Sequence, residues 1–169
     1  MEDLAALVEP QIPALRRYAW ALMRGDQAAD DLVQDCLERA ISRWHLRRRD
    51  GNLRAWLFTI MHNLFISARR RERRRGVDTP IESLPAEPSV RADQESMLAV
   101  ADILTALREL PDEQQAVLLL VGVEAFSYQE AAGILGIPIG TVMSRLSRGR
   151  ERLRRRLDAD GPAALRRVK

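Results

Sequence analysis

The sequence has almost none of the residues that build disulfide frameworks or zinc sites. Cys36 is the only cysteine, and His45 and His62 are the only histidines. The chain therefore cannot form an internal disulfide, and a Cys/His zinc site would have too few ligands. No stretch approaches 18 uncharged apolar residues, and the start Met1-Glu2-Asp3 lacks the basic segment of a signal peptide. We expect a cytoplasmic protein with no metal site and no membrane insertion.

Sequence signatures of catalysis are also absent. The chain has no Gly-rich phosphate loop and no Ser/His/Asp arrangement. We therefore predict no catalytic residues, no cofactor and no enzymatic activity. What the 169 residues do contain is 46% hydrophobic and 30% charged side chains, a composition typical of one or two small folded domains.

Charge is distributed in blocks along the chain. The net charge is only +3, yet residues 43–75 carry +9 and residues 141–169 carry +7, while residues 1–42 carry −4 and residues 76–140 carry −9. Nearly all the basic residues are arginine, because Lys169 is the only lysine. Two separated basic blocks fit either two contacts with one long polyanion or two solvated helix faces.

Hydrophobic residues recur at helical spacing nearly throughout, and no segment alternates at period two. The predicted fold is all-α, with helices over residues 11–23, 27–44, 53–74, 94–110, 112–123, 128–135 and 139–157. Gly76, Pro80, Pro85 and Pro88 interrupt the pattern, which indicates a flexible linker. We expect helical bundles at 1–75 and 94–158, a linker at 76–93 and a frayed tail at 159–169.

The C-terminal bundle has the pattern of a helix-turn-helix. Ser127 and Glu130 form a capping box that starts a short helix, and Gly136 can end it. The following helix places arginine and hydroxyl side chains near its N-terminus, where a recognition helix reads the major groove. The alternative is an ordinary helical hairpin with a basic exposed face.

The N-terminal bundle carries two polar features. Asp31, Gln34, Asp35 and Glu38 share one face of the helix over 27–44, opposite an apolar stripe that includes Cys36. The next helix mixes aromatic side chains with an arginine run over residues 69–75, a combination that suits single-stranded DNA. Phe65 is interpreted as a core residue. For Trp56, core packing and base stacking are equally good interpretations, and we expect His62 at the surface or next to DNA.

Several motifs resemble bacterial sigma factors of the extracytoplasmic function (ECF) group. Residues 30–35, Asp-Asp-Leu-Val-Gln-Asp, resemble region 2.2, and residues 53–63, Leu-Arg-Ala-Trp-Leu-Phe-Thr-Ile-Met-His-Asn, resemble the segment that handles the −10 element. Residues 109–114, 126–132 and 140–150 resemble region 4. The resemblance covers both bundles in the expected order, and the presence of regions 2 and 4 alone is similar to the ECF group.

The resemblance implies a transcription initiation factor that directs core RNA polymerase to promoters. The residues it implies for docking on the β′ clamp helices are Asp31, Gln34, Asp35 and Glu38. Those implied for binding and melting the −10 DNA are Arg47, Arg48, Arg49, Asn52, Trp56, Asn63 and Arg70. Those implied for reading the −35 element are Thr141, Met143, Ser144, Arg145, Ser147 and Arg148. The polymerase β subunit and an inhibitory anti-sigma factor are further implied partners.

Position 143 departs from the family pattern, because Met143 stands where arginine or lysine is common. This leaves the −35 preference open and could favour contact with a thymine methyl. Two other classes remain as alternatives: a stand-alone helix-turn-helix regulator that dimerises on a palindrome, and an RNA-binding module that uses the arginine runs without reading bases.

Overall fold

The computed structural model describes residues 4–48, 50–76 and 94–160. Over these residues the chain is helical and has no strand, so the predicted all-α class is confirmed. Residues 4–76, here called the N-terminal half, form α1 (Leu4–Val8), η1 (Glu9–Gln11), α2 (Ile12–Leu22), α3 (Asp26–Ser42), η2 (Trp44–Leu46) and α4 (Leu53–Arg75). Residues 94–160, the C-terminal half, form α5 (Gln94–Arg108), α6 (Asp112–Leu118), the π-helical turn η3 (Leu119–Val123), α7 (Tyr128–Leu135) and α8 (Ile139–Asp160).

Local capping signals set most of the helix ends. Gly25, with φ of 108°, turns the chain between α2 and α3, and the Asn52 side chain accepts a hydrogen bond from Ala55 N at the start of α4. α4 ends at Gly76 in the left-handed conformation. The short α1 is an element that the apolar pattern did not predict. Of the predicted linker at 76–93 only Gly76 is described, and of the predicted tail at 159–169 only residues 159 and 160 are described.

α2, α3 and α4 pack around the core of the N-terminal half. Cys36 and Phe65 are fully buried, as predicted, and burial raises the pKa of the Cys36 thiol to about 12. His62 is also buried, at 8% exposure, so its predicted surface position is wrong. It faces inward because α4 is covered on more than one side, by α2 and α3 and also by the C-terminal half.

The C-terminal half is built on the crossing of α6 and α8. A Cβ added at Gly149 would lie 3.0 Å from Leu118 Cδ1, so the missing side chain allows the two helices to approach closely. Val142 and Leu146 on α8 are buried against α6 and α7. α7 and α8 thus form the predicted helix-turn-helix, with the exposed side of α8 turned outward.

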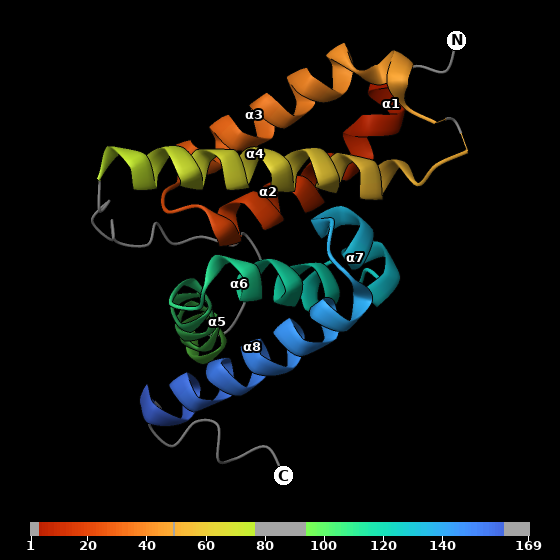
Figure 1. The fold of residues 1–169 in the computed structure, drawn as a ribbon. Coiled ribbons are helices and arrows are strands. Elements are labelled where there is room, and N and C mark those ends of the chain that lie inside the picture. Colours follow the sequence, from red (N-terminus) through yellow and green to blue (C-terminus); the bar gives the residue numbers. More distant parts are fainter. Residues whose placement is uncertain (1–3, 49, 77–93, 161–169) are drawn as a thin grey trace.

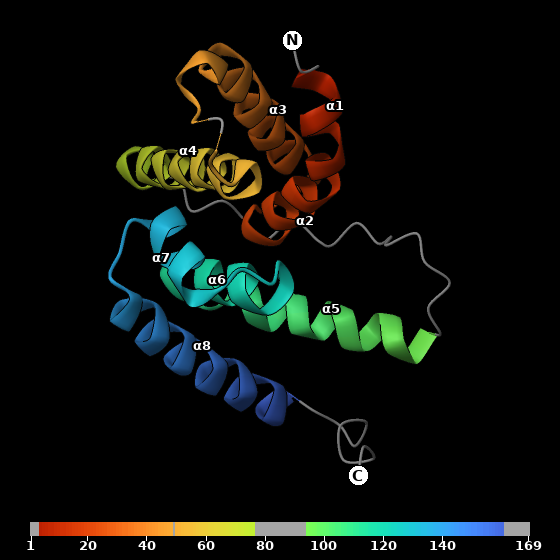
Figure 2. The same ribbon diagram turned by 90° about the vertical axis from the view of Figure 1, so that its right-hand side faces the viewer.

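The two halves are packed against each other (Figures 1 and 2). α7 and α6 lie beneath α4 and α2, and α3 lies on the far side of the N-terminal half. The hydrophobic core is continuous across the contact, where the Phe58 and Phe126 rings meet edge to face with centroids 5.0 Å apart. The prediction of two bundles did not foresee this contact, which we call the seam.

Candidate functional site

The predicted docking residues lie together on α3. Asp31, Gln34, Asp35 and Glu38 are all exposed, while Leu32, Val33, Cys36 and Ala40 on the opposite side are buried in the core. Gln34 Nε2 donates to Glu38 Oε1 at 2.9 Å, which keeps this polar row ordered along the helix. α3 lies on the side of the N-terminal half that is farther from the C-terminal half (Figures 1 and 2). Its polar row is an accessible acidic surface for a basic partner.

Three of the predicted −10 residues form a stripe along α4. Trp56, Asn63 and Arg70 are seven residues apart, which places them on one side of a helix. Asn63 and Arg70 are exposed, and Trp56 is half-buried. The structure therefore combines the two interpretations of Trp56, because its ring packs beside the core and still keeps an accessible surface.

A second tryptophan completes an aromatic cluster beside the basic turn. Trp44 is half-buried, and its ring lies edge to face with that of Trp56, with the ring centroids 6.1 Å apart. The Arg47 guanidinium lies 4.7 Å from the Trp44 ring centroid. Two ring surfaces and an arginine at one place suit a stacked nucleobase and its phosphate. The sequence analysis did not name Trp44 as a −10 residue. The sequence feature that could have identified it is an aromatic residue shortly before an arginine-rich turn.

The remaining members of the −10 set lie in the turn before α4. Arg48 is exposed and pairs loosely with Asp50 at 3.5 Å, and Arg49 lies outside the described residues. Asn52 is exposed but donates a hydrogen bond to Glu130 Oε1 of the C-terminal half at 2.9 Å. This residue is therefore engaged in the seam.

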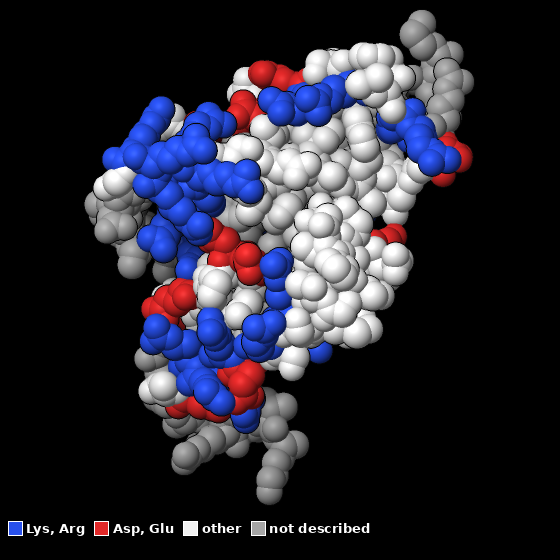
Figure 3. Space-filling model, in the orientation of Figure 1, with Lys and Arg blue, Asp and Glu red and all other residues white. Residues whose placement is uncertain are grey.

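The end of α4 is strongly basic. Arg69 and Arg73 pair with Asp112 of α6 at 3.3 and 3.1 Å. Arg70, Arg71, Arg74 and Arg75 are exposed and make no ion pair with any described residue. Figure 3 shows this end of α4 as a basic patch, with a second basic patch over α8 on the same face of the molecule. A polyanion approaching from this side meets both halves.

The recognition helix is positioned by the predicted capping box. Ser127 Oγ accepts from Glu130 N at 3.1 Å, and Glu130 Oε2 accepts from Ser127 N at 2.9 Å. These hydrogen bonds hold the pKa of the Glu130 carboxyl below its usual range. Gly136, with φ of 64°, ends α7 and allows the sharp entry into α8.

Five of the six predicted −35 residues lie on the accessible side of α8 or beside it. Met143, Ser144, Ser147 and Arg148 are exposed, and Thr141 is half-buried. The Arg148 guanidinium donates to the carbonyl and hydroxyl oxygens of Ser144 at 3.3 and 3.2 Å. A shallow groove beside them is lined partly by Tyr128, Met143, Ser147 and Arg150. This surface offers hydroxyl, guanidinium and apolar groups to base edges and phosphates.

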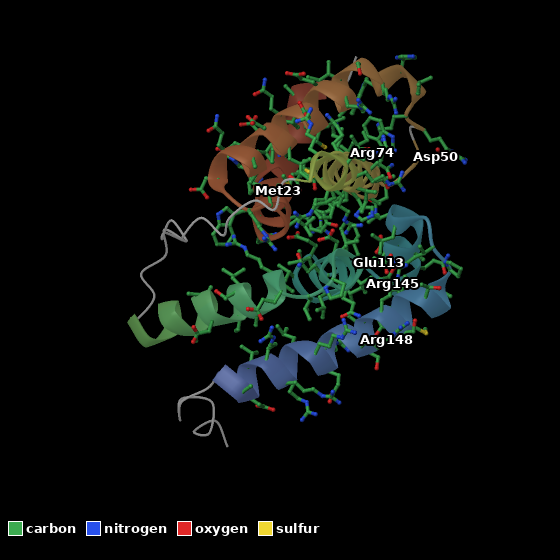
Figure 4. The ribbon with its side chains drawn as sticks, turned by 60° about the vertical axis from the view of Figure 1, so that its left-hand side comes forward. Met23, Asp50, Arg74, Glu113, Arg145 and Arg148 are labelled. Atoms are coloured by element: carbon green, nitrogen blue, oxygen red, sulfur yellow. The ribbon has the colours of Figure 1, made fainter. Side chains whose placement is uncertain are left out.

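Arg145 points to the other side of the helix. Its guanidinium pairs with Glu113 Oε2 of α6 at 3.2 Å, and its side chain is only 23% exposed. Figure 4 shows Arg145 beside Glu113, between α8 and α6. The structure thus separates Arg145 from Arg148, and the implied −35 contact of Arg145 remains a prediction.

A buried polar pair lies beside the seam. Tyr18 Oη and His62 Nδ1 are 3.5 Å apart. Burial and the nearby Arg145 lower the pKa of His62 to about 4, and burial raises the pKa of Tyr18. Both groups are therefore neutral at pH 7. No group of side chains in the described part of the chain could hold a metal ion, and no described helix is long and apolar enough to cross a bilayer.

Comparison with known families matches both halves. Residues 8–62 match the family described as the Sigma2 domain of PhyR, and residues 101–153 match Sigma-70, region 4. The chain is 39% identical over 153 residues to the ECF RNA polymerase sigma factor EcfG of Rhodopseudomonas palustris, covering 89% of this chain and 82% of that protein.

Solved structures give the same picture. The sigma factor RpoE of Bartonella quintana, in complex with the anti-sigma factor NepR, superposes with a TM-score of 0.81 at 36% identity and covers 95% of this chain and 100% of that one. The structure of CnrH in complex with the cytosolic domain of CnrY superposes with a TM-score of 0.69 at 27% identity, over 93% of this chain and 88% of that one. The similarity extends across the N-terminal and C-terminal halves together.

Proposed function

The chain belongs to the ECF RNA polymerase sigma factors, and from this premise we propose that it binds core RNA polymerase and directs it to promoters with particular −35 and −10 elements. It acts in the cytoplasm as a binding subunit, without catalysis or a cofactor of its own. The observation that carries the proposal is that one chain presents an acidic docking face, an aromatic–basic stripe and a helix-turn-helix, each accessible on its own element.

We divide the chain accordingly. Residues 1–75 are region 2, residues 94–158 are region 4, residues 76–93 are the linker and residues 159–169 are a tail. In region 2, α3 docks on the polymerase β′ clamp helices, and the turn before α4 together with the Trp56, Asn63 and Arg70 stripe binds melted −10 DNA. In region 4, which also contacts the β subunit, the exposed side of α8 reads the −35 element.

Opening the −10 DNA needs a prepared site for an extruded base, because unstacking and unpairing a base costs a few kcal/mol. The Trp44–Trp56 cluster supplies ring surfaces, and the neighbouring arginines supply positive charge for the backbone. Region 4 then contacts the −35 element as double-stranded DNA, which does not have to be melted. One polymerase subunit can thereby couple recognition of one element to opening of the other.

We also infer that an anti-sigma factor holds this protein inactive. Support comes from the Bartonella quintana relative, whose structure contains the anti-sigma factor NepR, and from CnrH, solved with a domain of CnrY. The sequence does not identify the inhibitor of this chain.

The test is promoter-dependent run-off transcription with purified core polymerase. Reversing Asp31 and Asp35 to arginine should abolish core binding and transcript while leaving helicity intact, because both side chains are exposed. The matched control reverses Glu9 and Asp158, two exposed carboxylates outside every predicted site. A double mutant at Asp31 and Asp35 that competes for core at wild-type concentration contradicts the docking assignment. Tight binding to a palindrome without polymerase would instead indicate a stand-alone regulator.

A further inference from the structure

The seam contains a carboxylate that is buried between arginines of the other half. The Glu124 side chain is 1% exposed. Its oxygens accept hydrogen bonds from Arg17 Nε and Nη2, each at 2.8 Å, and from Arg54 Nη2 at 2.8 Å. Arg54 Nη1 also donates to the Glu124 carbonyl oxygen at 2.8 Å. Because an unpaired buried carboxylate is very unfavourable, Glu124 can occupy this position only while both halves are together.

The backbone around Glu124 is shaped to reach this position. α6 continues into the π-helical turn η3, and Ala125 has a φ of 55°, a conformation that L-residues with a Cβ rarely adopt. The turn carries Phe126 against Phe58, with the Arg54 guanidinium 4.3 Å from the Phe126 ring centroid. A strained turn persists where its surroundings hold it, and here part of those surroundings belongs to the other half.

Two flanking contacts extend the seam along α4. Asn52 bonds to Glu130 at the beginning of the helix, and Arg69 and Arg73 pair with Asp112 near its end. All three sets of contacts therefore involve α4 or its N-cap residue Asn52, and α4 carries the proposed −10 residues Trp56, Asn63 and Arg70. The seam is also rich in charged groups, as are interfaces between domains that separate.

If the chain has the proposed function, it must contact both promoter elements at once. The closed molecule is too small to do so. A compact chain of this length has a radius of gyration of about 15 Å. The −35 and −10 elements are about 25 base pairs apart, or about 85 Å at roughly 3.4 Å per base pair. Region 4 must therefore leave α4 before both elements can be engaged.

We propose that the segment Glu124–Phe126 is an intramolecular latch that keeps the protein closed in the absence of polymerase and DNA. The latch engages Arg17 and Arg54 and is flanked by the Asn52–Glu130 and Arg69/Arg73–Asp112 contacts. While it is engaged, region 4 covers the seam side of α4. Release of the latch exposes the seam side of α4 and frees Asn52.

Intramolecular energy transfer tests the latch directly. Dyes on Ser67→Cys of α4 and Asp158→Cys near the end of α8 report the distance between the halves. Both positions are exposed, the C-terminal ends of α4 and α8 lie on the same side of the closed molecule (Figure 1), and Cys36 is fully buried. Glu124→Gln and Asp112→Asn each remove one charge from the seam. The matched control is Glu151→Gln, whose ion pairs with Arg154 and Arg155 lie within α8.

The latch predicts high transfer in the wild-type protein and in the control. It predicts that Glu124→Gln raises the ratio of open to closed molecules by about tenfold or more, because the change removes the buried carboxylate that pairs with both Arg17 and Arg54. Asp112→Asn should shift the ratio in the same direction by a smaller factor, since the Asp112 side chain is 16% exposed whereas that of Glu124 is 1% exposed.

An open wild-type protein would overturn the latch, and so would unchanged transfer in both seam variants with helical circular dichroism retained. If Glu124→Gln loses its helicity, Asp112→Asn decides: opening supports the latch and no change overturns it. The experiment contains neither polymerase nor DNA. Failure of the latch is therefore distinct from failure of the proposed function, which transcription measures.

Discussion

Trp56 is the single residue whose partial burial is most useful to the proposed function. Its ring is held by Trp44, so it is pre-organised, and part of its surface remains available to an unpaired base. Asn63 lies two helical turns further along the same side. The pair thus offers one stacking surface and one hydrogen-bonding group to the melted strand.

Trp56→Ala and Asn63→Ala should therefore impair promoter opening more than formation of the closed complex. Stacking of one base on an aromatic ring contributes about 1–3 kcal/mol. Permanganate reactivity of unpaired thymines measures the opening, and Ser67→Ala, an exposed change on the same helix, is the control. Normal strand opening by both variants would eliminate this role. Loss of the fold in Trp56→Ala would show that its core contacts dominate.

His62 makes stability depend on pH. Its pKa is about 4 in the folded protein, against 6.5 for an ordinary histidine. Around it lie Tyr18 of α2, Phe65 of α4 and Arg145 of α8. The unfolded chain takes up a proton near pH 6.5, while the folded protein does not until about pH 4. The free energy of unfolding is therefore highest above pH 6.5 and falls as the pH decreases toward 4.

Between pH 7 and pH 4.5, protonation of His62 in the unfolded chain should lower the free energy of unfolding by about 2–3 kcal/mol. Urea unfolding at the two pH values measures it. His62→Gln should show a correspondingly smaller decrease, and the comparison with wild type cancels the titration of the carboxylates. Equal pH dependence in the two proteins would mean that His62 is not held neutral by the fold.

At the scale of elements, the arginines of α8 differ in the groups that they contact. Arg148 is exposed near the start of the helix and bonds only to Ser144 of the same helix, whereas Arg155 lies two turns later and pairs with Glu151 at 2.8 Å. A residue near the start of a recognition helix reaches base edges, and one farther along reaches only backbone phosphates.

Arg148→Ala should therefore change the ranking of single-base −35 variants, with a loss of about 1–3 kcal/mol at one position. Arg155→Ala should weaken all variants equally, if at all, and lower the salt slope by at most about 1. Binding of holoenzyme to the variant set at two salt concentrations distinguishes these outcomes. A uniform loss in Arg148→Ala would identify it as a phosphate clamp.

Elements with local signals could be predicted from the sequence. α3 follows from its apolar stripe, α7 from the Ser127–Glu130 capping box and Gly136, and the acidic face of α3 from helical spacing alone. α1 is too short for a periodic pattern to show. The position of Arg145 could not be foreseen, because it depends on Glu113 of another helix rather than on neighbours along α8.

At the scale of the whole molecule, the seam was beyond prediction for the same reason. Glu124 has the sequence appearance of an ordinary surface charge, and its partners Arg17 and Arg54 are 107 and 70 residues away. No periodicity or capping rule links such positions. The sequence predicted the two bundles and their functional faces, but the contact between them depends on tertiary packing.

The shared core predicts cooperative unfolding, which can be measured with two probes. All three tryptophans, Trp20, Trp44 and Trp56, lie in the N-terminal half, and among the ring contacts of the described residues only that of Trp20, with Arg108, joins a tryptophan to the C-terminal half. Fluorescence therefore reports mainly the N-terminal half, while circular dichroism reports both. In the wild-type protein the two urea transitions should coincide. In Glu124→Gln they should separate, because the halves no longer stabilise each other. Separate transitions in the wild type would show that the seam contributes little stability.

The position of α3, opposite the seam, also determines an order of events. Its acidic face is already accessible in the closed molecule, so polymerase can be engaged before the halves part. Binding of polymerase and opening of the sigma factor then become two kinetic steps. The rate of the first is proportional to polymerase concentration, and the second is a unimolecular rearrangement whose rate does not depend on that concentration. A sigma factor built this way searches for its enzyme as a small compact body and takes on its extended, promoter-spanning form only once the enzyme is bound.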